Sequence, residues 1–165
     1  MKHGPRLEAG GRRSGLLVIL CAVVLTLTGC GLQIPSDPRG TLDAVTDGVL
    51  RAGASVSGDL VREEAGTLSG SEVTLIEGFA AEHSATIEWT VGSEETLVGM
   101  LEDGSLDVVI GGMTQDTPWV DKAGVTRGYA GIPGSDGRAL VMLVPLGENR
   151  MLSALETYLD EEVGG

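Results

Sequence analysis

Few side chains in this chain could support covalent or metal chemistry. The 165 residues include two cysteines and two histidines, and only Cys30 and His83 lie outside the N-terminal leader described next. One cysteine and one histidine cannot form a zinc site or a Cys/His or Ser/His relay. Glu102 and Asp103 are neighbours at an expected helix end and point apart, so they do not form a catalytic pair. We therefore expect no metal, no cofactor and no enzymatic activity.

The N-terminus is basic, then apolar, and this segment ends in Leu27-Thr28-Gly29-Cys30. The apolar run Leu16–Leu27 can enter a bilayer but is shorter than the roughly 20 residues of a stable span. The pattern resembles a bacterial lipoprotein signal sequence. This implies cleavage before Cys30, acylation of the Cys30 thiol, and attachment to the extracytoplasmic face of the cell membrane. The alternative is an ordinary secretory leader, or a buried helix that ends in cysteine.

Three parts are expected: a signal peptide at 1–29, a lipidated cysteine with a flexible tether at 30–45, and one domain at 46–165. The tether is indicated by proline, serine and glycine between 31 and 40. Removing the leader takes away four of the 11 basic and one of the 24 acidic residues, which leaves a net charge near −16. Such a surface favours solubility and repels phosphate backbones, so nucleic acid is not an expected partner.

The rest of the chain alternates strand-like and helix-like patterns. Ile87, Trp89 and Val91 alternate with polar residues, as in a half-buried strand, and Trp89 is expected in the core. Ser71 is expected to cap a helix. This order predicts an α/β domain whose mostly parallel sheet has helices on both faces. Strands are expected at Val49–Ala54, Ala85–Val91, Leu106–Ile110 and Ala139–Val144, helices at about 71–83, 93–104 and 151–162, and a polar connection at 55–69.

Ligands of such sheets bind beyond the carboxyl ends of the strands, here after Ala54, Val91 and Ile110. The most distinctive of these places is the third, where Gly111-Gly112-Met113-Thr114 follows a buried strand. This sequence resembles the ligand loop of the amino-acid-type periplasmic solute-binding proteins (family 3) that serve ABC transporters. The resemblance covers most of residues 46–130 and resumes at Ala139. The other matching segments are Val49–Ala54, Gly70–Leu75, Ser93–Asp107 and Val125–Tyr129.

The chain departs from that family at three places. Family members have a second lobe after the segment that matches Tyr129, whereas only residues 130–138 stand there, so the chain is similar to the first lobe alone. Trp119 occupies the position of the arginine that pairs with the ligand carboxylate. Residues 55–60 supply no aromatic ring in place of the family's aromatic loop. A one-sided site of this kind is expected to bury less than the usual 70–90% or so of a ligand.

Several candidate residues have two interpretations. Trp119 either anchors a partner or fills the groove that the second lobe would cover. Two roles are open for Glu72. The preferred one is an acid in the first turn of a helix, where the helix dipole favours a negative charge, and the other is an acid that binds a ligand. Arg127 is expected to pair with a surface acid rather than with a ligand.

Two functions follow. The first is a membrane-anchored solute-binding lipoprotein that works with a transporter permease or another membrane protein, with a second copy or a partner closing its groove. The candidate ligand-binding residues are Ser55, Glu72, Gly112, Met113, Thr114 and Trp119. The alternative is a protein-interaction or regulatory module that keeps one lobe without a ligand and docks through Asp116, Trp119 and Arg127.

Overall fold

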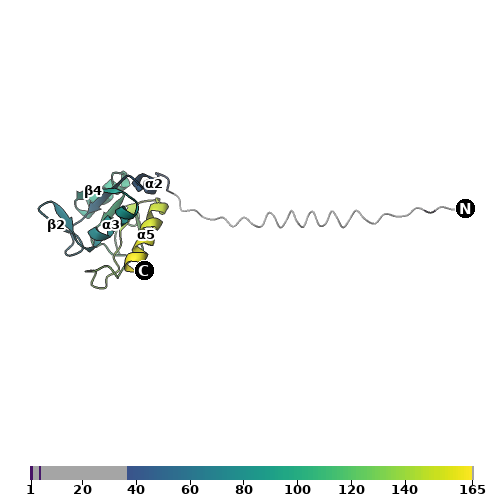
Figure 1. The fold of residues 1–165 in the computed structure, drawn as a ribbon. Coiled ribbons are helices and arrows are strands. Elements are labelled where there is room, and N and C mark those ends of the chain that lie inside the picture. The colour runs from purple at the N-terminus through teal and green to yellow at the C-terminus, as the bar shows by residue number, and fades with distance from the viewer. Residues whose placement is uncertain (2–3, 5–36, 165) are drawn as a thin grey trace. The chain divides into compact units, whose positions relative to one another are not determined.

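The computed structural model describes residues 1, 4 and 37–164, and the last of these ranges belongs to one compact unit (Figure 1). Apart from residues 1 and 4, the expected leader lies outside the described residues, and so does Cys30. None of the helices over the described residues has the length and apolar character of a membrane span. In chain order the elements are α2 (Thr41–Val45), β1 (Val49–Ala54), β2 (Arg62–Glu64), β3 (Thr67–Ser69), α3 (Ser71–Glu82), β4 (Thr86–Val91), α4 (Glu94–Glu102), β5 (Val108–Ile110), β6 (Ala123–Val125), β7 (Leu143–Pro145) and α5 (Asn149–Val163).

Five strands form one mostly parallel sheet in the order β4-β1-β5-β7-β6. Strand β1 pairs in parallel with β4, where Val49 lies opposite Thr86, and with β5, where Ala52 lies opposite Val108. The helical crossovers α3 and α4 connect these parallel strands, as the alternating sequence pattern predicted. Strand β7 runs antiparallel to both of its neighbours. The predicted α/β fold class is confirmed.

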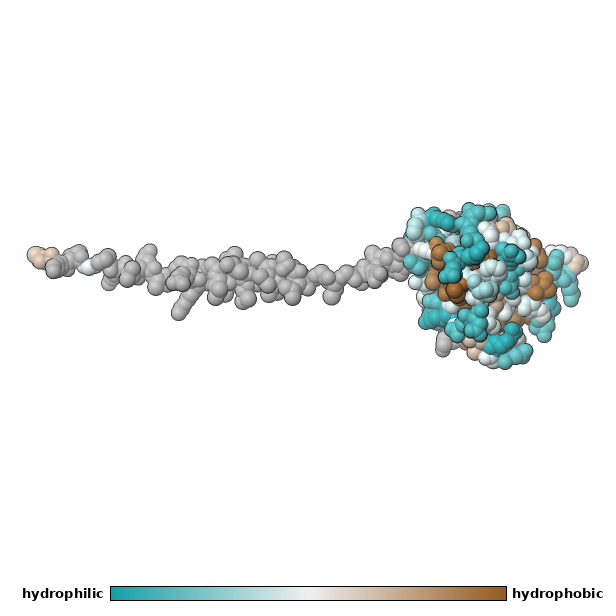
Figure 2. Space-filling model, turned by 180° about the vertical axis from the view of Figure 1, so that it is seen from behind, coloured by the Kyte–Doolittle hydropathy of each residue, from teal (hydrophilic) through white to brown (hydrophobic). Residues whose placement is uncertain are grey.

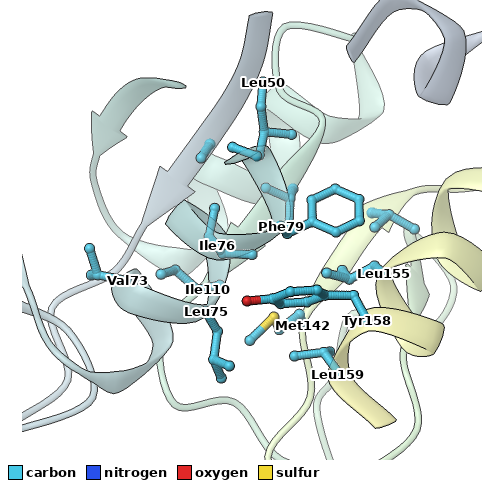
Figure 3. Packing of buried hydrophobic residues seen from close by; sticks show 14 of the residues in the cluster. Leu50, Val73, Leu75, Ile76, Phe79, Ile110, Met142, Leu155, Tyr158 and Leu159 are labelled. Atoms are coloured by element: carbon cyan, nitrogen blue, oxygen red, sulfur yellow. The ribbon is translucent and has the colours of Figure 1, made fainter. Parts of the chain in front are cut away.

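The sheet is buried on both faces. In β5, Val108 and Ile110 contact a cluster that includes side chains of α3 and α5, whereas Val109 contacts a second cluster that includes α4. This explains why the run before Gly111 is apolar without alternation. Figure 3 shows the first cluster, in which the rings of Phe79 and Tyr158 meet edge to face at 5.8 Å.

The domain begins earlier than expected. Residues 41–45, expected as the end of a tether, form α2, and Val45 is fully buried in the first cluster. The Thr41 hydroxyl donates a 2.8 Å hydrogen bond to the carboxylate of Glu148, which also accepts from the backbone N–H of Arg39. These bonds join the segment to the residue that precedes α5. The donors are a threonine hydroxyl and a backbone N–H. Neither leaves a periodic pattern in the sequence, so this attachment of the segment to the domain could not be predicted.

Other differences concern short elements. The expected connection at 55–69 contains the hairpin β2–β3, whose turn has positive φ angles at Ala65 and Gly66. Strand β6 lies in a stretch without strand periodicity, and the last strand, expected over 139–144, is confined to β7. Trp89 lies on β4 at the sheet edge and is half-buried against the core, as its alternation indicated.

The two predicted helix starts had different outcomes. Ser93, where the second helix was expected to begin, caps α4: its hydroxyl accepts a hydrogen bond from the N–H of Thr96 at 3.3 Å. The prediction that Ser71 caps α3 was wrong. The cap position is Gly70, whose φ of 129° and close approach to the Leu60 carbonyl leave no room for a side chain.

Two helical glycines give a matched stability test. A methyl group at Gly78 in α3 would collide with the hydroxyl oxygen of Tyr158, whereas one at Gly99 in α4 would meet open space. Gly78→Ala should lower the free energy of unfolding by about 1–3 kcal/mol because buried Tyr158 must shift. Gly99→Ala should raise it by up to about 1 kcal/mol because alanine favours the helix. Urea unfolding of both variants measures these changes.

Removing the obstructing hydroxyl is the control. In a Tyr158→Phe background the cost of Gly78→Ala should shrink, and an unchanged cost would contradict the collision as its cause.

Candidate functional site

The candidate site lies beyond the carboxyl ends of β1 and β5. The two strand ends are joined by a 2.9 Å hydrogen bond from the Ser55 N–H to the Ile110 carbonyl. Gly112 follows with a φ of 70°, and a side chain there would collide with Ser57. The loop after β5 therefore requires glycine at this position, both for its backbone conformation and for its packing.

Glu72, in the first turn of α3, is held against this loop. Its Oε2 accepts hydrogen bonds from the backbone N–H groups of Gly111, at 3.1 Å, and Gly112, at 2.8 Å. The side chain is fully buried, and its Oε1 has no hydrogen-bond partner among the described residues. Burial raises the pKa of Glu72 from 4.5 to about 7, although the two hydrogen bonds and the charge of Arg138 lower it. This geometry makes Glu72 a support for the loop rather than a group exposed to a ligand.

A hollow of about 300 Å³ opens on the outer side of the loop. It brings together acids and one base, because Glu94 and Asp116 line it together with Arg138. The backbone and side chains between these charges are small or apolar. The remaining lining residues are Gly112, Met113, Thr114, Thr117 and Pro118.

Residues 130–138, which the sequence resemblance predicted to replace a second lobe, form a folded turn. Tyr129 and Leu140 exchange two backbone hydrogen bonds, of 2.8 and 3.2 Å, that close the turn at its base. The buried Ser135 hydroxyl donates to the Ala130 carbonyl at 2.8 Å. The Val141 N–H donates to the Met113 carbonyl at 2.9 Å, so the end of the turn lies beside the loop after β5. The described residues thus form a single lobe.

Trp119 is half-buried beside α4. Its ring packs against the second cluster, and its Nε1 donates a 3.2 Å hydrogen bond to Oε2 of Glu94. The next residue, Val120, is 54% exposed. The indole therefore helps to hold Glu94 at the rim of the hollow.

Arg127 is engaged elsewhere. Its guanidinium makes ion pairs with Glu156, at 3.4 Å, and Asp160, at 2.7 Å, both on α5. This arrangement matches the surface pairing considered for Arg127, and the structure shows no contact from Arg127 to Asp116 or Trp119 among the described residues.

The structure therefore brings together some of the predicted residues. Gly112, Met113, Thr114 and Asp116 line the hollow. Ser55 and Glu72 support the loop from behind. Sequence reasoning missed Glu94 and Arg138. Glu94 lies in the first turn of α4, where the helix dipole favours any acid, so its position alone indicates no binding role. Arg138 lies too far along the chain from Thr114 for spacing to connect them.

Metal binding has no support in this arrangement. No group of three or more His, Cys, Asp or Glu side chains among residues 37–164 could hold a metal ion.

Comparison with solved structures finds this fold in one domain of TmArgBP and in an ancestral amino acid-binding protein. The arginine-bound form of domain 1 from TmArgBP matches with a TM-score of 0.62 and 22% identity, covering 72% of this chain and 97% of that chain. The ancestral amino acid-binding protein AncCDT-1, a precursor of cyclohexadienyl dehydratase, matches with a TM-score of 0.57 and 15% identity, covering 73% and 92%. No family model and no curated protein matches. The chain therefore shares its fold with domain 1 of TmArgBP and with AncCDT-1.

The buried carboxyl group of Glu72 predicts an unusual pH dependence. The unfolded chain loses this proton near pH 4.5, whereas the folded chain keeps it up to about pH 7. The folded state therefore binds more protons in this window, and its free energy of unfolding should fall by about 3 kcal/mol as the pH rises from about 4.5 to about 7. Glu72→Gln keeps an oxygen for the two N–H groups and cannot ionise, so it should lack this decline.

Urea unfolding of both proteins at a series of pH values measures the difference, in which the contributions of the other acids cancel. If the free energy of unfolding changes with pH in the same way in both proteins, the pH dependence does not come from Glu72.

Proposed function

We propose that this chain is a single-lobe binding protein for a small solute of the amino-acid type. The observation that carries the proposal is the hollow beyond β5, where Gly112–Thr114 lie between the acids Glu94 and Asp116 and the base Arg138. An amino acid carries both signs of charge, so a site lined by both signs complements it. A few convergent polar groups in a concave site are typical of small-molecule binding.

The comparison with TmArgBP bears on the missing second lobe. Domain 1 of that protein has been crystallised in an arginine-bound form, and the match covers 97% of that chain. A single lobe of this fold can thus hold an amino acid without a second domain in the same chain. This supports solute binding here despite the absence of a second lobe from the described residues.

We further propose that the protein acts on the extracytoplasmic face of the membrane, anchored through acylated Cys30, and delivers its solute to a transporter permease. The basic and apolar leader and the Thr28-Gly29-Cys30 sequence support the anchor. An acyl anchor would keep the domain beside a membrane partner without a spanning helix.

A docking module is the second candidate. Three apolar side chains are exposed near this end of the sheet's sequence: Val56 two residues after β1, Val91 at the last position of β4, and Val120 next to Trp119. Figure 2 shows one face of the domain, on which hydrophobic areas lie between larger hydrophilic ones. A partner or a second copy of the chain that docks on Asp116, which lines the hollow, would cover part of it. This candidate predicts partner capture or dimerisation without solute binding.

A thermal-shift screen of the full chain in mild detergent against amino acids, amines, small peptides and sugars tests solute binding. A ligand at 100 times its Kd should stabilise the fold by about 2.7 kcal/mol, which raises Tm by several degrees. Asp116→Asn should weaken the response to a cationic amino acid, whereas the matched control Asp121→Asn, outside the hollow, should not. A panel that leaves Tm unchanged throughout would contradict solute binding and favour docking.

Cys30→Ser tests the anchor. In a bacterial host the variant should lose palmitate labelling and leave the membrane fraction, because no thiol remains at the acylation position. Cys21→Ser changes the other cysteine, within the leader, and should keep both properties. Label retained by Cys30→Ser, or lost with Cys21→Ser, would be inconsistent with acylation of Cys30.

A further inference from the structure

Arg138 is held by the turn 130–138 and lies beside the loop after β5. It ends the turn 130–138, and the following residues pair with Tyr129 and with Met113. Its backbone N–H and its Nε both donate to the Ser135 carbonyl, each at 3.0 Å. Since Ser135 is itself buried and bonded to Ala130, the turn fixes the base of the arginine side chain.

The guanidinium of Arg138 faces open space beside the ligand loop. Arg138 lines the hollow of about 300 Å³ with Gly112–Thr114, and also two further hollows, one with Ser57–Leu60 and one with Gln115 and Ala139. Within the part of the chain that the structure describes, its hydrogen bonds involve only the backbone N–H and Nε. Both terminal nitrogens therefore remain available to a ligand.

The other charges of the hollow have the opposite sign. Glu94 stands at the start of α4, with its Oε2 bonded to the Trp119 indole, and Asp116 is exposed on the loop. A ligand in this hollow meets one fixed cation and two carboxylates. A guanidinium is planar and presents paired donors that match a carboxylate, whereas carboxylates attract ammonium and guanidinium groups.

We infer that Arg138 is the anchor for the ligand carboxylate, supplied by the turn that stands in place of a second lobe, and that Glu94 and Asp116 select an amino acid with a cationic side chain. This inference rests on the proposed solute binding. It also accounts for Trp119: a tryptophan at that loop position contributes no guanidinium, and it positions Glu94 instead.

The test compares L-arginine with agmatine, which keeps the guanidinium and one amine but has no carboxylate. Titration calorimetry of the full chain should show tighter binding of L-arginine. Arg138→Gln should weaken L-arginine binding about ten- to a hundredfold, the usual effect of losing hydrogen bonds to a charged group. It should not weaken agmatine binding, because agmatine has no carboxylate for Arg138 to bind and is itself a cation. Arg138→Lys should restore part of the affinity, because the charge returns without the paired donors.

Arg150→Gln is the matched control. It removes the same charge from a residue that pairs with Asp43 on α2, so it should leave L-arginine binding unchanged. Far-ultraviolet circular dichroism of each variant confirms that it is folded.

The possible failures are distinguishable. If the unmodified chain binds no amino acid, the proposed function itself is wrong. If it binds L-arginine and Arg138→Gln changes nothing, or weakens agmatine equally, solute binding stands and the carboxylate anchor is overturned. Tighter binding of a neutral or acidic amino acid than of L-arginine would overturn the role of Glu94 and Asp116.

Discussion

The contact on which the candidate site depends is the one between the Glu72 carboxylate and the backbone N–H groups of Gly111 and Gly112. Consecutive N–H groups after a strand attract an anion, and here a side chain of the protein fills that place. The contact fixes the loop after β5 against α3, and the loop in turn presents Met113 and Thr114 to the hollow. Burial of a carboxyl group costs free energy, and the packing of the rest of the core must offset this cost.

The second constraint is the closure of the lobe. Tyr129 and Leu140 pair directly through two backbone hydrogen bonds, so the chain returns to the domain after the short turn 130–138. The pairing allows β7 to insert between β5 and β6 and complete the sheet. It also brings Arg138 to the ligand loop. The same nine-residue turn thus closes the domain and contributes the positive charge of Arg138 to the candidate site.

The main strands and helices could be predicted because burial leaves a pattern of apolar residues in the sequence. Burial on one face gives the alternation of Ile87, Trp89 and Val91, and burial on both faces gives the continuous apolar run before Gly111. Short elements such as α2, β6 and the β2–β3 hairpin left no such pattern. Their places depend on distant partners, for example Glu148 for Thr41. Within the site, Gly112–Thr114 were recognisable from local order. Arg138 was not, because its proximity to Thr114 comes from the pairing of strands that are far apart in the sequence.

The central claim is that one lobe of this fold binds an amino acid without help from another domain or copy. The most direct measurement is the calorimetric stoichiometry of L-arginine binding to the full chain, with the oligomeric state of the same sample determined by sedimentation velocity. The account predicts a saturable isotherm with one ligand per chain and a protein that stays monomeric. One ligand per two chains, with dimer formation, would show that a second copy supplies the missing wall and would contradict the claim, as would the absence of any binding heat.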